Sequence, residues 1–167
     1  MNDTSHTHAG SAFTALIIET FRLNGELLAA GDKLCASLGL TSARWQVLGA
    51  IDGGPLPVAH IARNMGLTRQ AVQRVADELA REGFIAFSDN PHHRRAKLAG
   101  LTAKGRASLD EVNRRQADWA NRIVEGFDPA SIEAAAALAE TLRRRLAEDG
   151  CEVPPHSVSL PEGRENA

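Results

Sequence analysis

The stretch VAHIARNMGLTRQAVQRVADELAREGFI, residues 58–85, decides the fold of this chain. Its first part predicts a short helix over 58–65, and Gly66 then marks a tight turn. Thr68 is a favourable N-cap for a second helix, which runs to about Glu82. Two helices joined by so short a turn are typical of a helix-turn-helix.

The second helix of this pair is expected to have one buried and one exposed face. At about 100° per residue, the apolar residues that gather on one side are Val72, Val75, Ala76 and Leu79. The residues that point away from them are Gln70, Gln73, Arg74 and Asp77. Glutamine pairs with an adenine edge and arginine with a guanine edge through two hydrogen bonds, so the outward face is suited to reading a major groove. Thr68 and the free amides beside it suit a phosphate. An ordinary solvent-exposed helix face is the alternative.

A β-hairpin is predicted directly after these helices. Residues 84–89 alternate between apolar and polar side chains, 90–94 read as a turn, and 95–101 read as a returning strand. The cationic or protonatable side chains at its tip are His92, His93, Arg94 and Arg95. Arginine on a narrow ribbon can enter a minor groove, and Lys97 is placed to contact a phosphate. The alternative is a polar turn whose arginines pair with Asp89 or water.

Charge is unevenly distributed along the 167 residues, whose net charge is −2. Nine basic and four acidic residues lie between Arg63 and Arg106, so this window has a charge of +5 and the rest of the chain has −7. A basic segment in an acidic protein is typical of a polyanion-binding surface, although on charge alone a solvated face is equally good. The candidate DNA contacts are Thr68, Arg69, Gln70, Gln73, Arg74, His92, His93, Arg94, Arg95 and Lys97.

Helices are also expected before this central segment. A disordered head over 1–11 precedes a long first helix over 12–38. The apolar residues of that helix at helical spacing are Phe13, Leu16, Ile17, Leu23, Leu27, Leu34 and Leu38. A second helix covers about 42–51, and the glycines and prolines of 52–57 predict a turn.

Two further helices are expected after the hairpin. Thr102 caps a long helix that runs to about Phe127, and Asp128 begins the last helix, over 130–148. The apolar residues of the last helix, at three-four spacing, are Ile132, Ala135, Ala139, Leu142 and Leu146. Such a narrow seam is typical of a helix that packs against a partner, so we expect the first and last helices to contact another chain. The tail over 149–167 is expected to be flexible.

Composition and spacing disfavour several classes of protein. No apolar run approaches the roughly 20 residues of a membrane-spanning helix, so we expect a soluble, cytoplasmic protein with no membrane partner. Cys35 and Cys151 lack the spacing of a disulfide framework and are expected to be reduced. The paired histidines lack further ligands at metal spacing. Because no nucleophile, base and acid recur in a recognisable arrangement, we expect neither an enzyme nor a metal site or cofactor.

Over roughly residues 12–148 the sequence resembles the MarR-type winged-helix transcriptional regulators. The matching stretches are LTSARWQVLGAI at 40–51, the stretch over 58–85, and DNPHHRRAKLAGLTAKG at 89–105. In the last of these the family has a hairpin with D-R-R followed by L-T-x-x-G. His93 stands where that aspartate, which orients the wing arginine in the family, usually lies.

The resemblance implies a mainly α fold with a small β wing. A winged helix-turn-helix domain would span 42–101, and dimerisation helices would span 12–38 and 103–148. The implied function is that of a sequence-specific DNA-binding transcriptional regulator, a repressor, which binds double-stranded DNA at a pseudo-palindromic operator as a homodimer. A small aromatic or phenolic effector would modulate DNA binding from a cleft between the first, second and fifth helices. The candidate cleft residues are Arg22, Trp45, His60 and Trp119.

Two alternatives stay open. A dimeric winged-helix module that binds proteins without reading DNA sequence would have the same fold. A redox sensor is the other, because some members of the family sense peroxide through a cysteine near the first helix, where Cys35 lies. Such sensors commonly support the thiolate with tyrosines, and the sequence contains no tyrosine, so an apolar filler is the favoured role for Cys35.

Overall fold

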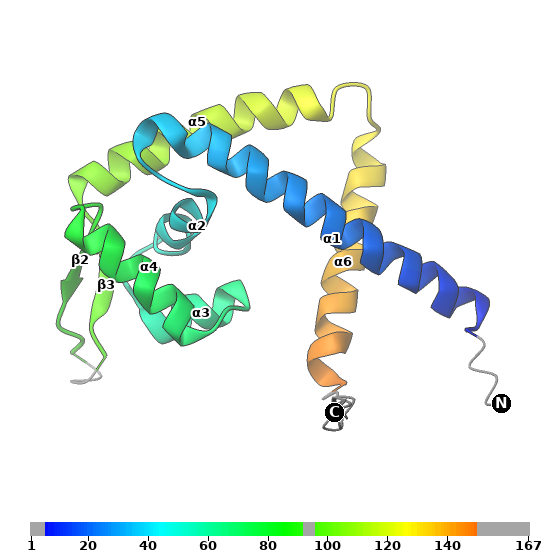
Figure 1. Ribbon diagram of the computed structural model, residues 1–167, viewed down its shortest axis with the longest axis horizontal. Coiled ribbons are helices and arrows are strands. Elements are labelled where there is room, and N and C mark those ends of the chain that lie inside the picture. The colour runs from blue at the N-terminus through cyan, green and yellow to red at the C-terminus, as the bar shows by residue number, and fades with distance from the viewer. Residues whose placement is uncertain (1–5, 92–95, 150–167) are drawn as a thin grey trace, which may run out of the picture. The chain divides into compact units, whose positions relative to one another are not determined.

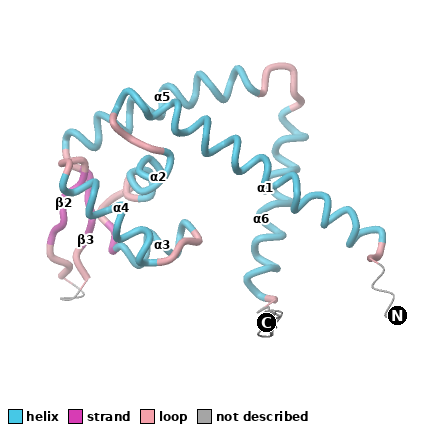
Figure 2. The backbone as a smooth tube through the Cα atoms, in the orientation of Figure 1, coloured by secondary structure: helices cyan, strands magenta, loops and turns pink. Residues whose placement is uncertain are grey.

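The computed structural model describes residues 6–91 and 96–149, and it is mainly helical with one small sheet (Figures 1 and 2). Its elements in chain order are α1 (His8–Cys35), the 3-10 turn η1 (Ala36–Leu38), α2 (Ser42–Ala50), β1 (Leu56–Pro57), α3 (Val58–Met65), α4 (Arg69–Arg81), β2 (Ile85–Ser88), β3 (Leu98–Leu101), α5 (Ala103–Ile123) and α6 (Pro129–Glu148). The chain divides into two compact units, Met1–Ile123 and Val124–Ala167. The predicted fold class is confirmed.

α1 begins at His8, so the prediction of a disordered head over 1–11 was wrong for its last residues. The side chain of Thr7 accepts a hydrogen bond from the backbone N–H of Gly10 at 3.0 Å and thereby caps the helix. At the other end, α1 tightens into η1 and stops at Gly39, whose φ of 69° is in the left-handed region.

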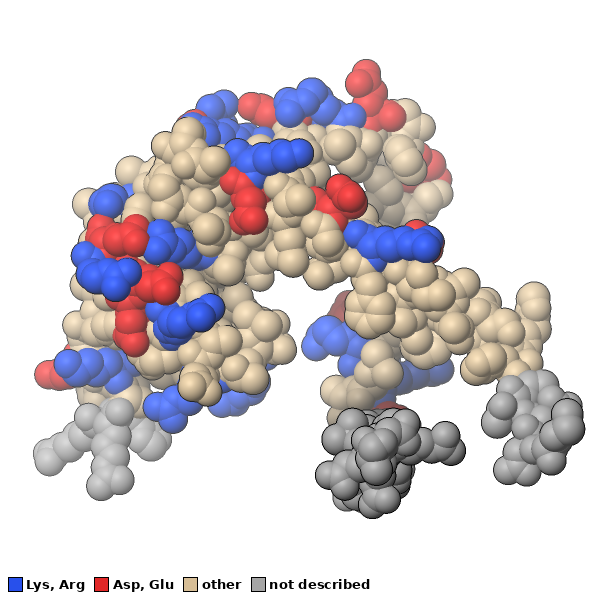
Figure 3. Space-filling view, viewed as in Figure 1, with Lys and Arg blue, Asp and Glu red and all other residues tan. Residues whose placement is uncertain are grey.

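Most of α1 lies outside the core. Its buried residues are Gly31 and Cys35, both in its last third. The large apolar residues that stay exposed along it are Leu16, Ile17, Ile18, Phe21, Leu23, Leu27 and Leu28. The first part of the helix is largely free of charged side chains on the face shown in Figure 3. α1 therefore presents an apolar surface that its own unit does not cover.

The structure confirms the predicted helix-turn-helix. α3 ends at Gly66, where φ is 64°, and Thr68 caps α4 by accepting a hydrogen bond from the N–H of Ala71 at 3.2 Å. The predicted inward residues that are buried are Ile61, Ala62, Val72, Ala76 and Leu79. Val75 packs against the edge of this core. These side chains fix α3 and α4 on a common core and leave the opposite face of α4 in solvent.

A three-stranded antiparallel sheet lies beside these helices, in the order β1-β3-β2. The turn predicted over 52–57 was wrong for its last two residues, because Leu56 and Pro57 form β1. Pro57 offers no backbone N–H, and it is tolerated here because β1 is an edge strand. The predicted returning strand over 95–101 begins only at Leu98 in the part of the hairpin that is described.

The junction of β3 with α5 accounts for the sequence L-T-x-x-G. The hydroxyl of Thr102 donates to the carbonyl of Gly83 at 2.7 Å and accepts from the N–H of Gly105 at 3.1 Å. A Cβ atom at Gly105 would lie 1.9 Å from the carbonyl oxygen of Phe84, so a larger residue cannot fit without moving the backbone. Lys104 lies over the aromatic ring of Phe84, with its Nζ 4.0 Å from the ring centroid.

Two arginines of α5 attach this helix to earlier parts of the chain. Arg106 forms an ion pair with Asp52, and it also donates to the Asp52 carbonyl at 3.0 Å. Arg115 donates to the carbonyl of Leu34 at 3.1 Å and to the hydroxyl of Ser37 at 2.7 Å. α5 is thus held to the turn after α2 and to the end of α1.

α5 ends at Ile123, before the predicted end at Phe127, where the chain turns through Gly126 with a φ of 83°. In the second unit, Asp128 caps α6 as predicted, because its carboxylate accepts from the N–H of Ala130 at 3.2 Å. No residue of α6 is buried within this unit. Its apolar seam is therefore also largely uncovered, with Leu142 half-buried and the other members exposed.

Candidate nucleic-acid interface

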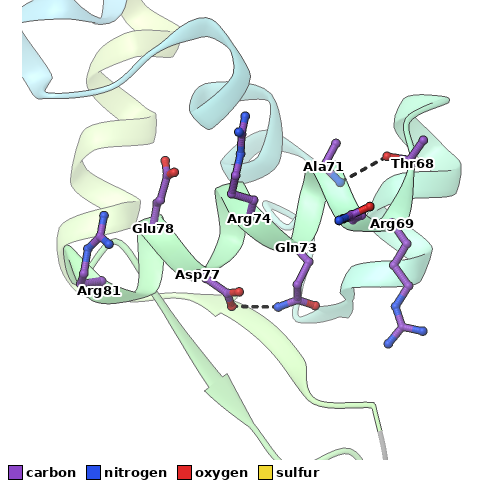
Figure 4. Close-up of a pocket in the computed structure, with 9 residues that line it drawn as sticks. Thr68, Arg69, Ala71, Gln73, Arg74, Asp77, Glu78 and Arg81 are labelled. Atoms are coloured by element: carbon purple, nitrogen blue, oxygen red, sulfur yellow. Dashed lines mark hydrogen bonds between the residues drawn. The ribbon is translucent and has the colours of Figure 1, made fainter.

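The outward face of α4 borders a surface groove of about 1070 Å³. The predicted contacts that line it are Thr68, Arg69, Gln70, Gln73 and Arg74. All are exposed except Gln73, which is half-buried. Figure 4 shows Arg74 and Glu78 extending from one side of α4, while Gln73 and Asp77 face each other on another side. The helix therefore presents hydrogen-bonding groups on more than one of its accessible sides.

Gln73 is not a free glutamine. Its Nε2 donates a hydrogen bond to Oδ1 of Asp77 at 2.8 Å, one helical turn further along α4 (Figure 4). Asp77 itself is exposed. Sequence reasoning placed both residues on the outward face and missed the bond between them, although their i,i+4 spacing is a signal for such a pair.

A second groove, of about 400 Å³, lies where α4 meets the sheet and the start of α3. Arg69 of α4 and the exposed Lys97, just before β3, line it together with Gln73 and Asp77. Two cations thus flank the base of the hairpin, where a phosphate is expected to lie. The predicted contacts His92, His93, Arg94 and Arg95 lie outside the described residues.

Some of the basic residues between Arg63 and Arg106 are already bonded to groups of the protein itself. Lys104 donates to the carbonyl of Glu82 at 2.8 Å, and Arg106 is paired with Asp52. On the face shown in Figure 3, basic and acidic side chains are interspersed over α4. The cations that the structure leaves at the two grooves are Arg69, Arg74, Arg81 and Lys97.

An arginine of α2 neutralises two of the acidic groups near α4. Arg44 lies 2.6 Å from Glu82 and 3.4 Å from Glu78, and its side chain is only 16% exposed. The hydrogen bond from Arg44 lowers the pKa of Glu82 below its ordinary value, so this carboxylate stays ionised and paired. This pairing fixes α2 against α4 and was missed from the sequence, because the partners are far apart along the chain.

A cleft of about 380 Å³ lies between α1, α2 and α5. Of the four predicted ligand contacts, Trp45 and Trp119 line it. Arg22 and His60 are not among its lining residues; Arg22 instead forms an exposed ion pair with Glu19, and His60 is exposed on α3. Every residue that lines the cleft is uncharged, and its polar members include Asn24, Gln46 and Gln116.

Cys35 is fully buried in the core at the end of α1. Burial, followed by the nearby charge of Asp32, raises the pKa of its thiol to about 11. The reactive thiolate is therefore scarce at neutral pH, which disfavours the redox-sensing alternative and supports the role of an apolar filler.

The described residues contain neither a metal-binding cluster nor a membrane-spanning helix. Across 6–91 and 96–149, no group of three or more metal-binding side chains lies close enough together to hold a metal ion. In the same residues, no helix is both long enough and apolar enough to cross a bilayer.

The sequence of this chain is similar to one known family and to several known proteins. Residues 38–96 match the sequence profile of the MarR family. The chain is 37% identical over 131 residues to an uncharacterised protein of Mycobacterium tuberculosis, Rv2011c, and the match covers 78% of this chain and 90% of that protein. It is also 30% identical over 103 residues to the HTH-type transcriptional regulator TcaR of Staphylococcus aureus, which covers 60% of this chain and 68% of TcaR.

Solved structures share the fold. The MarR family transcription regulator SP03579 superposes with a TM-score of 0.74 at 21% identity, over 87% of this chain and 97% of that one. CouR from Rhodococcus jostii RHA1, solved with bound p-coumaroyl-CoA, superposes with a TM-score of 0.67 at 24% identity, over 72% of this chain and 86% of CouR. The likeness to both therefore extends well beyond the helix-turn-helix.

Proposed function

This chain belongs to the MarR family of winged-helix, DNA-binding transcriptional regulators, a family of regulators and not of enzymes, and we propose that it represses transcription as a homodimer on a pseudo-palindromic operator. The observation that carries the proposal is the outward face of α4. There Gln70 and Arg74 are exposed, directly after a capped helix start at Thr68. In a helix-turn-helix this part of the second helix contacts base edges in the major groove.

The polar residues that line the grooves around α4 suit two different kinds of DNA contact. Gln70 and Arg74 suit base edges, because amide and guanidinium groups form paired hydrogen bonds there. Arg69 and Lys97 line the groove at the base of the hairpin and suit the phosphates on either side of the reading helix. Arg94 and Arg95, which the sequence predicts at the hairpin tip, would add minor-groove contacts.

The uncovered apolar surfaces of α1 and α6 support the homodimer. Phe21, Leu23 and Leu146 are each about 60% exposed or more. Monomeric soluble proteins rarely leave so many large apolar side chains in water, and burying them against the same helices of a second subunit removes that cost. A two-fold dimer would place two α4 helices in successive major grooves, with half-sites about 34–36 Å apart.

We propose further that the cleft between α1, α2 and α5 holds a small effector that alters DNA binding. Its volume of about 380 Å³ is within the range of small-molecule sites. The two indole rings and the absence of charge among its lining residues suit an uncharged aromatic group, such as a phenol. CouR, which has the same fold, was solved with an aromatic acyl-CoA. An effector changes DNA affinity only by its difference in affinity for the two states.

DNA binding is tested with the full chain and a duplex taken from upstream of its own gene, against a scrambled duplex, over a salt series. We expect a steep loss of affinity with salt and a preference for the native duplex. Arg74→Ala should lower that preference by roughly 1–3 kcal/mol, whereas the matched charge loss Arg114→Ala on α5 should not. Equal binding to both duplexes would instead favour a protein-interaction module.

Effector binding can be followed by intrinsic tryptophan fluorescence, because both tryptophans of the chain, Trp45 and Trp119, line the cleft. Titration with phenol should change the intrinsic fluorescence and shift the DNA-binding curve. Benzoate, which is of similar size but charged, should do so only at higher concentration. An equal response to both compounds would contradict the assignment of an uncharged ligand.

A further inference from the structure

The pair formed by Gln73 and Asp77 carries an inference about which bases the protein reads. The two side chains project from α4 into both grooves that border it. Their hydrogen bond of 2.8 Å runs from Nε2 of Gln73 to Oδ1 of Asp77. Asp77 is exposed and Gln73 is half-buried, so the pair is accessible from solvent.

The chemistry of the pair fixes the orientation of the amide. An ionised carboxylate only accepts hydrogen bonds, so the nitrogen of the Gln73 amide, and not its oxygen, must face Asp77. The opposite orientation would put two acceptors in contact. With one N–H of its amide bonded to Asp77, Gln73 keeps Oε1 and one further N–H for a ligand, and Asp77 keeps its second oxygen. Two of these three groups are acceptors, and one of the two is anionic.

A pair of acceptors selects among the edges that bases present in the major groove. Adenine N6 and cytosine N4 are donors there, whereas guanine shows only acceptors and thymine shows an acceptor and a methyl group. Phosphates are also excluded as partners of Asp77, because like charges repel. The nearby cations Arg69 and Lys97 take that role in the same groove.

We propose that Asp77 is a specificity-determining residue, which holds Gln73 so that the two present an acceptor surface to the amino group of an adenine or cytosine in each half-site. The inference rests on the proposed DNA-binding function and deepens it. A free glutamine would offer adenine both a donor and an acceptor, and could also rotate to donate to guanine. The hydrogen bond to Asp77 stops that rotation, and the second carboxylate oxygen repels the acceptors that guanine presents.

A purely structural role for the pair has a different consequence. Exposed i,i+4 pairs of this kind add only about 0.2–0.5 kcal/mol to helix stability. If that were the whole effect, breaking the bond would change the melting temperature slightly and leave base preference as it was. Base preference is therefore the deciding measurement.

The experiment is selection of bound sites from a randomised duplex library with the full-length protein and with Asp77→Asn. The wild-type protein should show one position in each half-site where adenine or cytosine is preferred by roughly five- to 100-fold over guanine and thymine. In Asp77→Asn the hydrogen bond from Gln73 can persist, but an amide N–H donor replaces the second carboxylate oxygen, so that preference should fall below about threefold while the other positions keep theirs. Asp118→Asn, which removes the same charge from an exposed face of α5, is the matched control and should retain the wild-type profile.

The double variant Gln73→Glu/Asp77→Asn exchanges donor and acceptor while it keeps the net charge. The hydrogen bond can then form in the reverse sense with an acceptor still facing outward, so the adenine or cytosine preference should return. An unchanged profile in Asp77→Asn would overturn the inference while leaving DNA binding in place. Failure of the wild-type protein to select any site would instead overturn the proposed function.

Discussion

Two regions of the molecule differ in how much they bury their apolar residues. One is the central segment from α2 to the first half of α5, and the other consists of the long helices α1 and α6. In the central segment, Leu48, Ile61 and Leu79 are fully shielded from solvent. In α1 and α6, residues of the same kind are exposed, as in Leu23 at 59% and Leu138 at 51%. The first region forms a complete core within one chain, whereas the second leaves apolar surfaces uncovered, which the proposed dimer would bury. Stability and assembly should therefore respond to different substitutions.

The largest effect is expected from Gly105→Ala, at the junction of the sheet with α5. The added Cβ would lie 1.9 Å from a backbone oxygen, so the junction must open, at a cost of more than about 3 kcal/mol. Urea unfolding monitored by circular dichroism measures this loss. Gly25→Ala in α1 is the matched control, because nothing lies within 4 Å of its added Cβ, and it should be neutral or slightly stabilising. Similar losses in both variants would contradict the comparison.

Leu79→Ala should destabilise the fold by roughly 2–5 kcal/mol, because it leaves a cavity in the central core. The loss should be the same at every protein concentration. The same substitution in the second region, Leu138→Ala, should have a smaller effect that grows on dilution. Melting curves over a hundredfold range of concentration test both, and a concentration-independent result for Leu138→Ala would weaken the distinction between the regions.

Leu142→Asp should dissociate the proposed dimer by putting a charge into the apolar seam of α6. The lost apolar burial is about 1.5–3 kcal/mol for each copy, while the central core should stay folded. Sedimentation velocity gives the oligomeric state and circular dichroism gives the helix content. A variant that sediments as a dimer would show that the seam is not the contact.

The smallest effect that we expect concerns the stability of the protein at low pH. Hydrogen bonds from Arg114 and then from Arg115 lower the pKa of Glu111 from 4.5 to about 2. A lowered pKa in the folded state stabilises the protein above the ordinary value, and this contribution is lost as the pH falls from about 4.5 to about 2. Glu111→Gln should therefore be slightly less stable at neutral pH and show a weaker loss of stability in that interval. An unaltered pH profile would mean that the arginines do not act through this carboxylate.

Local features of the sequence predicted much of the central fold. The bounds of α3 and the start of α4 follow from Gly66 and the cap at Thr68, and both signals act within a few residues. The buried face of α4 follows from helical periodicity alone. The position of the hairpin was also predicted, because it follows from alternation between apolar and polar residues.

Other features depend on contacts that no local pattern contains. β1 exists because Leu56 and Pro57 meet β3 from more than forty residues further along the chain. The ion pairs of Arg44 likewise join distant helices. At the candidate site, the sequence placed Gln73 on the correct face but could not give its rotamer, and the rotamer decides which of its atoms faces outward. Side-chain conformation, and not helix placement, limited the prediction there.

The short strand β1 has a consequence for behaviour at high concentration. A free strand edge can recruit a strand from another molecule, and such pairing propagates into aggregates. β1 is two residues long and ends in a proline, so its outer side offers very little backbone for that recruitment. We expect this edge to resist intermolecular strand addition even where many copies crowd together.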